Sequence, residues 1–154
     1  MGDVLVGIIM GSKSDMPAME KAKEILDELG ISNEVKVMSA HRQPEMVREY
    51  AAKAEGRGLL TIICGAGMAA HLAGAVAAGT TLPIIGVPIK SGALDGMDAL
   101  LSTVMMPTGI PVATVAIDGA KNAAFLAAQI VANNEPGVRA KLTAIREKMA
   151  EGNS

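Results

Sequence analysis

The chain has 154 residues, of which 50% are hydrophobic and 19% charged, and its formal net charge is −2. This length suits a single domain, and the charge provides no basic surface for nucleic acid. The two aromatic residues, Tyr50 and Phe125, form no stacking platform for single-stranded bases. The one cysteine, Cys64, excludes a disulfide within the chain and indicates a reducing compartment, which we expect to be the cytoplasm.

Hydrophobic periodicity predicts strands and helices that alternate along the chain. Apolar, β-branched runs predict strands over residues 4–10, 34–38, 59–64, 83–87 and 111–117. Amphipathic or alanine-rich stretches predict helices over residues 15–29, 44–55, 68–78, 93–105, 120–132 and 136–150. Five alternations with short connections predict a three-layer α/β/α sandwich around a five-stranded parallel sheet. We expect one catalytic domain over 1–154, with the helix at about 136–150 closing it.

Two stretches, 58–89 and 99–117, contain no Asp, Glu, Lys or Arg. Prolines and glycines interrupt both stretches, so neither offers the ~20 strongly apolar residues that a membrane helix needs. Buried strands and helices of a parallel sheet explain them better, and we expect no membrane partner. The helix expected over 68–78 is uncharged on every side, and on the outside of so small a domain only another copy of the chain can cover it. We therefore expect a homo-oligomer.

Polar chemistry is concentrated in three segments, each directly after an expected strand. They are Gly-Ser-Lys-Ser-Asp at 11–15, Ser-Ala-His-Arg at 39–42 and Gly-Ala-Gly-Met-Ala-Ala-His at 65–71, and together they contain both histidines. Ligands of open α/β sheets bind outside the carboxyl ends of the strands. The three segments are therefore expected to form one pocket, and the protein is expected to be an enzyme.

The first segment joins a strand to a helix, where free backbone N–H groups favour anions. Ser12 is a candidate phosphate donor, whereas the anionic Asp15 suits a ribose hydroxyl. The alternative is that Asp15 or Ser14 only caps the helix. The segment is not a Walker A loop, because Ser12 stands where that motif has its second glycine.

The second segment holds His41, a residue type that both gives and takes protons near neutral pH. Arg42 offers a planar fork for phosphate, and Ser39 offers a further donor. The alternative is an ordinary surface loop before the helix at 44. The combination of His41, Arg42 and Ser39 favours a functional segment over an ordinary loop.

The third segment fits the pattern G-x-G-x-x-A, but the acidic residue that a dinucleotide site requires about 20 residues later is absent. The glycines instead allow backbone to approach a small planar ligand. His71 either contacts that ligand or is a satisfied core histidine, and Cys64 is expected in the core. Two histidines and one cysteine in separate segments have no recognisable metal-ligand spacing, so no metal is expected.

Over about residues 4–132 the chain resembles the class I, bacterial-type family of N5-carboxyaminoimidazole ribonucleotide mutases. The resemblance rests on the three segments above and on T-T-L-P-I-I-G-V-P at 80–88, A-L-D-G-M-D-A-L-L-S at 93–102, M-P-T-G-I-P-V-A-T-V-A-I at 106–117 and A-K-N-A-A at 120–124. It implies a flavodoxin-like fold and, in purine (IMP) biosynthesis, transfer of a carboxyl group from N5 to C4 without ATP, metal or cofactor. It also implies a nucleotide substrate, a CO2 intermediate and a homo-octamer.

The resemblance assigns a role to each candidate site residue. His41 matches the family's general acid and base, Ser12, Ser39 and Arg42 would hold the 5′-phosphate, and Asp15 the ribose hydroxyls. The remaining substrate-binding positions are Ala40, Ala66, Gly67 and His71. Met68 and Ala73 stand where the family usually has Gly and Pro, and Met68 is expected to narrow the space beside the glycines.

Two alternatives remain open from the sequence. One is an aminoimidazole ribonucleotide carboxylase that takes CO2 directly, although its Ser-Asn-containing motif is absent from the third segment. The other is a non-catalytic sensor of phosphoribosyl ligands that uses the same pocket.

Overall fold

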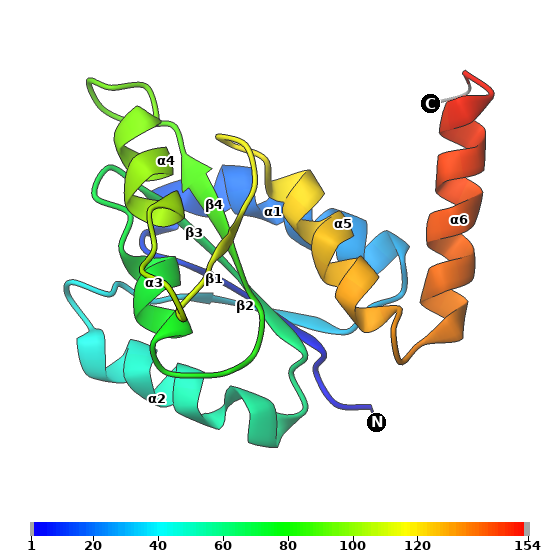
Figure 1. Ribbon diagram of the computed structural model, residues 1–154, viewed down its shortest axis with the longest axis horizontal. Coiled ribbons are helices and arrows are strands. Elements are labelled where there is room, and N and C mark those ends of the chain that lie inside the picture. Colours follow the sequence, from blue (N-terminus) through cyan, green and yellow to red (C-terminus); the bar gives the residue numbers. More distant parts are fainter. Residues whose placement is uncertain (1, 153–154) are drawn as a thin grey trace.

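The computed structural model describes residues 2–152 and confirms a three-layer α/β/α arrangement (Figure 1). Its sheet is parallel throughout, with strand order β2-β1-β3-β4-β5, the order of flavodoxin-like folds. The strands are β1 (Val6–Met10), β2 (Asn33–Val37), β3 (Thr61–Gly67), β4 (Ile84–Ile89) and β5 (Ala113–Thr114). The helices are α1 (Met16–Glu28), α2 (Pro44–Ala54), α3 (Leu72–Ala77), α4 (Met97–Val104), α5 (Ala120–Val131) and α6 (Pro136–Ala150), with short 3-10 turns at Lys13–Asp15 and Glu55–Arg57.

Side chains alternate across the strands into two separate cores. Ile8 and Met10 of β1 pack with α1 and α5 on one face, whereas Ile9 packs with α2 and α3 on the other. Small residues permit the close approach of these layers. At Gly7 a Cβ would lie 2.2 Å from the hydroxyl of Tyr50 on α2, so a larger residue there would displace the Tyr50 side chain. α4 also lies on the second face, where Thr103 packs over Gly86 of β4.

The structure corrects the expected strand over 59–64 and the expected helix over 68–78. β3 runs on to Gly67, because Ala66 and Gly67 still pair with β4. The helix begins only at Leu72, since Met68 has a left-handed backbone, with φ of 54°. Gly65 and Gly67 therefore belong to a strand end and do not form a helix-entry turn. α3 is buried toward α2 but exposes Ala75, so it is covered on one side only.

Two further elements are shorter than expected. α4 starts at Met97 because Asp95 and Gly96 are left-handed, which excludes a helix over 93–96. The strand expected over 111–117 pairs only at Ala113–Thr114, followed by isolated backbone bonds from Val115 to Gly86 and from Asp118 to Pro88. Cys64 lies in the core as expected, and burial raises the pKa of its thiol.

A membrane-spanning helix is not found within residues 2–152, where every helix is too short or too polar for that role.

Candidate active site

The three polar segments come together in one pocket at the carboxyl ends of β1, β2 and β3. β1 lies between β2 and β3 in the sheet, so the loops that follow these strands are neighbours. The pocket has a volume of about 450 Å³. It is lined by Gly11, Ser12, Ser14, Asp15, Ser39, Ala40, His41, Arg42, Ala66, Gly67, Met68, Ala69, His71, Leu72 and Ser91. Every candidate site residue expected from the sequence is therefore part of its wall.

The loop after β1 presents a hydroxyl pair and a carboxylate to the pocket. The Ser12 hydroxyl accepts a hydrogen bond from the Ser14 amide at 3.3 Å and lies 2.9 Å from the Ser14 hydroxyl. Ser12 thus caps the short 3-10 turn. The alternative left open from the sequence, that Asp15 or Ser14 caps the helix, finds no side-chain capping bond at the start of α1. Asp15 stands at the start of α1 but makes no side-chain capping bond, which leaves its carboxylate available to a ligand. Burial raises the pKa of Asp15, and a hydrogen bond with the Ser12 backbone lowers it by a smaller amount.

The loop after β2 is held by its own hydrogen bonds, which leave its charged side chain available. The Arg42 amide donates to the Ser39 hydroxyl at 3.2 Å, and the Gln43 amide donates to the Ser39 carbonyl at 2.8 Å. Within residues 2–152 no carboxylate forms a salt bridge with Arg42. An exposed guanidinium at a pocket wall, next to serine hydroxyls, is suited to an anionic group such as phosphate.

The two histidines of the chain meet in this pocket. His41 Nε2 lies 2.7 Å from His71 Nδ1, and the two rings are almost perpendicular, at 85°. One of these nitrogens donates and the other accepts, so the bond couples the tautomers of the two rings. His71 is exposed, which excludes the interpretation as a core histidine. The contact brings together residues 30 positions apart at the pocket wall.

The third segment contributes a strained residue. Met68 has φ of 54°, a left-handed conformation that costs a side chain without a local polar partner about 1–2 kcal/mol. A hydrogen bond connects the turn after Met68 to α4: the Ala70 amide donates to the Ser102 hydroxyl at 2.9 Å. Strain of this kind persists only where the surroundings impose it, and it is found preferentially at functional sites.

Ser91 lines the pocket but was not singled out from the sequence. It follows β4, and its hydroxyl oxygen lies 2.6 Å from where a Cβ on Gly67 would be, so it packs directly against the end of β3. The rule that selected the other segments, a polar residue just after a predicted strand, would also have found it. Its closeness to Gly67 depends on the pairing of β3 with β4, which the sequence does not give.

The pocket therefore combines three chemical features. Hydroxyl groups and a guanidinium can hold an anion, a carboxylate can accept hydrogen bonds from hydroxyls, and a histidine pair can give and take a proton. Apart from His71, the third segment adds only apolar side chains to the wall. This set suits a phosphorylated sugar that carries a small group undergoing proton transfer.

Comparisons with known proteins show which proteins this chain is similar to. The model of the family described as AIR carboxylase matches residues 5–152. A protein of Pyrococcus horikoshii named N5-carboxyaminoimidazole ribonucleotide mutase is 61% identical over 138 residues, which cover 90% of this chain and 78% of that protein. A protein of Vibrio parahaemolyticus with the same name is 54% identical, and the match covers 95% and 92% of the two chains. The crystal structure of Treponema denticola PurE superimposes with a TM-score of 0.86 at 33% identity, covering 96% of this chain and 92% of that one.

Proposed function

The chain belongs to the AIR carboxylase family, and from this premise we propose that it is an N5-carboxyaminoimidazole ribonucleotide mutase of purine biosynthesis. The enzyme moves the carboxyl group of its substrate from N5 to C4 of the aminoimidazole ring, which makes it an isomerase. The observation that carries the proposal is the pocket itself, which joins an anion-binding set to a histidine pair in one 450 Å³ space. Relatives of 53–61% identity that bear this name support the reaction type.

Substrate binding is divided among the three segments in this proposal. Arg42, Ser39 and Ser12 hold the 5′-phosphate, because the guanidinium has no carboxylate partner in the described residues and the hydroxyls supply further donors. The Asp15 carboxylate accepts hydrogen bonds from the ribose hydroxyls. The imidazole ring lies against Ala40, Ala66, Gly67 and His71, which complete the wall. Anchoring the phosphate fixes the ring with respect to His41 and removes the entropic cost of orienting it.

His41 is the proposed general acid and base. A proton from His41 goes to the carbamate nitrogen, the N–C bond breaks, and CO2 and aminoimidazole ribonucleotide are formed in the pocket. C4 then attacks CO2 to form the new C–C bond, and His41 takes the C4 proton, which restores the aromatic ring and the starting state of the histidine. The two transfers are sequential, so one residue performs both, for a rate gain of roughly 10²–10⁴.

The experiment that tests this function compares two substrate mixtures. Freshly made N5-carboxyaminoimidazole ribonucleotide is supplied without ATP in one, and aminoimidazole ribonucleotide with bicarbonate in the other. Rapid formation of the C4-carboxylate from the carbamate alone is the expected result. Efficient turnover of the bicarbonate mixture would instead mean a carboxylase, and nucleotide binding with no turnover in either would mean a sensor.

The matched variant for this assay is His41→Asn. It should abolish turnover while nucleotide affinity, measured by isothermal titration calorimetry, stays near that of the wild type, because asparagine keeps a polar group of similar size but cannot transfer the proton. Near-native turnover would show that His41 is not the acid and base.

We further propose that the protein acts in the cytoplasm as a homo-octamer. The absence of a disulfide within a chain that has one cysteine fits a reducing compartment. The incompletely covered outer side of α3 and several exposed apolar residues on and after α4 support assembly with further copies.

A further inference from the structure

Ser102 lies on α4, outside the pocket wall, and is bonded to the turn that carries His71. The Ala70 amide donates to the Ser102 hydroxyl at 2.9 Å, across 32 positions of the chain. Within residues 2–152 this hydroxyl is the one hydrogen-bond partner of the Ala70 amide. Ala70 is 2% exposed, so water does not replace the bond, and the backbone next to His71 is held from α4.

The Ser102 hydroxyl is oriented to accept a hydrogen bond from this amide. Its own hydrogen goes to the Asp98 carbonyl, which is 2.7 Å away, whereas the Ala99 and Met68 carbonyls lie farther away, at 3.3 and 3.4 Å. A serine hydroxyl has one hydrogen and two acceptor lone pairs. Donation along the helix therefore leaves a lone pair for the Ala70 amide and fixes its direction.

The helix α4 is a rigid support for this bond. Its inner side packs against the sheet, where the buried Thr103 lies over Gly86 of β4. The turn over residues 68–71 has little support of its own. Its first residue is left-handed, and within these four described residues the one backbone bond joins the His71 amide to the Ala69 carbonyl. The position of the turn therefore depends on the bond from α4.

The ring of His71 reaches the proposed acid and base from this turn. His71 Nδ1 lies 2.7 Å from His41 Nε2. This contact depends on where the backbone places the His71 ring, because hydrogen bonds weaken steeply when their geometry is poor. The bond also assigns a donor and an acceptor, and so fixes the tautomer of each ring. The contacts thus run from Ser102 through the Ala70 amide and the His71 ring to His41.

We propose that Ser102 is a positioning residue for the proton transfers: its hydroxyl holds the His71 ring at the place where it hydrogen-bonds to His41. This role rests on the proposed mutase function and adds to it. Ser102 touches neither the substrate nor the reacting atoms, and it exchanges no proton. The bond from the Arg42 amide to Ser39, within the segment proposed to hold the phosphate, does not involve α4. Loss of the Ser102 hydroxyl should therefore affect kcat more than KM.

Kinetics of three variants with N5-carboxyaminoimidazole ribonucleotide test this role. Ser102→Ala removes the acceptor, and Ser102→Thr keeps the hydroxyl. Thr143→Ala is the matched control, because the Thr143 hydroxyl also bonds to a carbonyl four residues earlier on its helix, that of Arg139 on α6, at 3.1 Å. We expect kcat to fall roughly tenfold to hundredfold in Ser102→Ala with KM little changed, because small misplacements of groups at a reacting centre have effects of this size. The threonine variant should recover most of the lost kcat, and the control should match the wild type.

Magnetic resonance of the histidine rings gives a readout that a purely structural role would not change. The chain has two histidines, so protein with isotope-labelled histidine gives ring signals from His41 and His71 alone. At a pH where both rings are neutral, the wild type should show each ring in one tautomer. Ser102→Ala should show averaged tautomers, while Ser102→Thr and Thr143→Ala keep the wild-type spectrum. The measurement needs no substrate, so it reports the arrangement of the rings independently of turnover.

Each other outcome overturns the proposal. Normal kcat in Ser102→Ala would mean that the hydroxyl positions nothing that the reaction uses. A lower kcat with an unchanged histidine spectrum would place the effect outside the histidine pair, and a raised KM at normal kcat would assign the bond to substrate binding. A threonine variant as slow as the alanine variant would exclude the hydroxyl as the cause. A failure of the mutase function is distinguishable, because it appears as missing turnover in the wild-type enzyme.

Discussion

At the scale of single residues, charged side chains of the pocket have few partners within the described part of the chain. Arg42 has no carboxylate partner in residues 2–152, and the carboxylate of Asp15 caps nothing although it stands at a helix start. Met68 carries backbone strain. The partly buried carboxylate of Asp15 and the left-handed backbone of Met68 are both unfavourable for folding, and both lie at this pocket, which is where function is expected to override stability.

Replacement of Arg42 by alanine should weaken nucleotide binding more than it slows the chemical step. Loss of a charge-assisted contact to phosphate corresponds to about 1.5–3 kcal/mol, or roughly a tenfold to hundredfold rise in Kd. Titration calorimetry with the nucleotide and a comparison of KM with kcat measure this. Arg48→Ala on α2, an exposed arginine paired with Glu45, is the control and should bind normally. An unchanged Kd in Arg42→Ala would refute the anchoring role.

Replacement of Asp15 by asparagine should weaken nucleotide binding without lowering the stability of the fold. Because burial raises the pKa of Asp15, its ionised form is less favourable in the folded chain than in the unfolded one. The stability cost therefore grows as pH rises from the unfolded pKa through the folded one, and at pH 7 Asp15→Asn should melt no lower than the wild type. Its nucleotide affinity should fall about tenfold with the loss of a charged acceptor.

Melting curves between pH 3 and pH 8 and calorimetric titrations test both halves of the Asp15 prediction. Glu20→Gln, on the exposed side of α1, serves as the control. A clear drop in the melting temperature of Asp15→Asn at pH 7, with normal affinity, would show that the carboxylate supports the helix and not the ligand.

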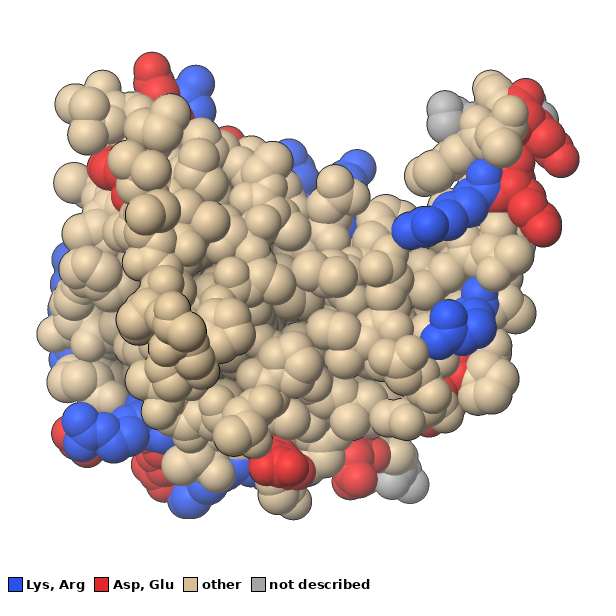
Figure 2. All heavy atoms as spheres, viewed as in Figure 1, with Lys and Arg blue, Asp and Glu red and all other residues tan. Residues whose placement is uncertain are grey.

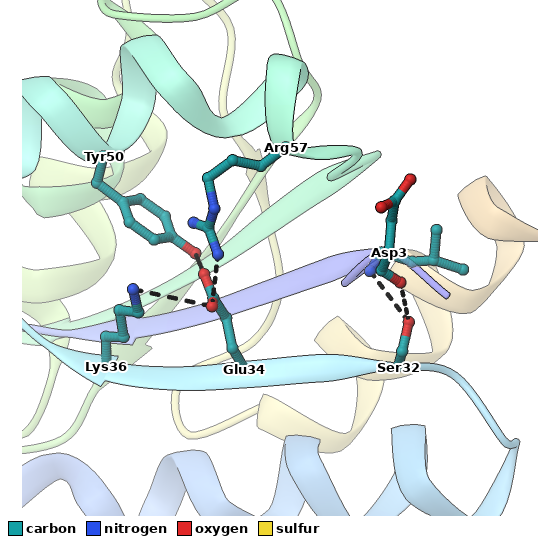
Figure 3. A network of polar contacts seen from close by, with 7 residues as sticks. Asp3, Ser32, Glu34, Lys36, Tyr50 and Arg57 are labelled. Carbon is teal, nitrogen blue, oxygen red and sulfur yellow. Dashed lines mark hydrogen bonds and ion pairs between the residues drawn. The ribbon is translucent and has the colours of Figure 1, made fainter. Parts of the chain in front are cut away.

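At the scale of elements, a polar network connects the edge strand β2 to α2 and to the 3-10 turn that follows it (Figure 3). Glu34 of β2 accepts hydrogen bonds from Arg57 at 2.7 Å and from the Tyr50 hydroxyl at 2.8 Å. Lys36 lies 3.8 Å from the same carboxylate. The bond from Arg57 is the main reason why the pKa of Glu34 is lowered, and it outweighs the opposing effect of burial.

This network should make stability depend on acid. A lowered pKa in the folded state means that the contribution of Glu34 is complete above the unfolded value near 4.5 and is lost as pH falls through the folded value. Glu34→Gln should reduce the free energy of unfolding by about 1–2 kcal/mol at pH 7, allowing for partial screening by solvent.

Urea titrations at pH 7 and below pH 4 check this, since the difference between the two proteins should shrink in acid. Glu45→Gln, at an exposed pair on α2, should change stability by less than about 0.5 kcal/mol. A Glu34→Gln protein as stable as the wild type at pH 7 would mean that the charge of Glu34 does not contribute to the free energy of unfolding.

At the scale of the whole molecule, charge is unevenly distributed. In Figure 2, Lys, Arg, Asp and Glu lie around the rim of the visible face and on α6, and a broad central area has none of them. Exposed apolar side chains occur on α4 and in the segments beside it, namely Leu94, Met97, Leu101, Val104, Met105 and Ile110. Apolar surface on this scale is typical of an interface between chains.

Light scattering coupled to size exclusion should therefore show an oligomer, with eight copies as the proposed number. Leu101→Asp should shift the wild-type assembly toward smaller species, because it places a charge in the apolar surface. Met149→Asp on α6 is the control with similar exposure and should leave the assembly intact. A monodisperse monomer from the wild-type chain would contradict the oligomer.

The sequence by itself determined the order of the elements, the class of the sheet and the position of the pocket. These follow from local signals: apolar periodicity, residues that end helices such as Gly30, and polar segments placed just after strands. The helix starts at 120 and 136 were predicted correctly for the same reason. The order of the strands in the sheet did not have to be known, because the carboxyl ends of parallel strands lie at the same edge of the sheet whatever that order is.

Only the tertiary structure decided what depends on contacts between distant segments. Pairing with β4 extends β3 to Gly67. Left-handed residues at Met68 and Asp95 make α3 and α4 begin later in the chain than the sequence pattern predicts. The bond between His41 and His71, the packing of Ser91 against Gly67 and the raised pKa of Asp15 each arise where elements meet in space. Distances and burial are properties of packed layers, and a linear pattern does not contain them.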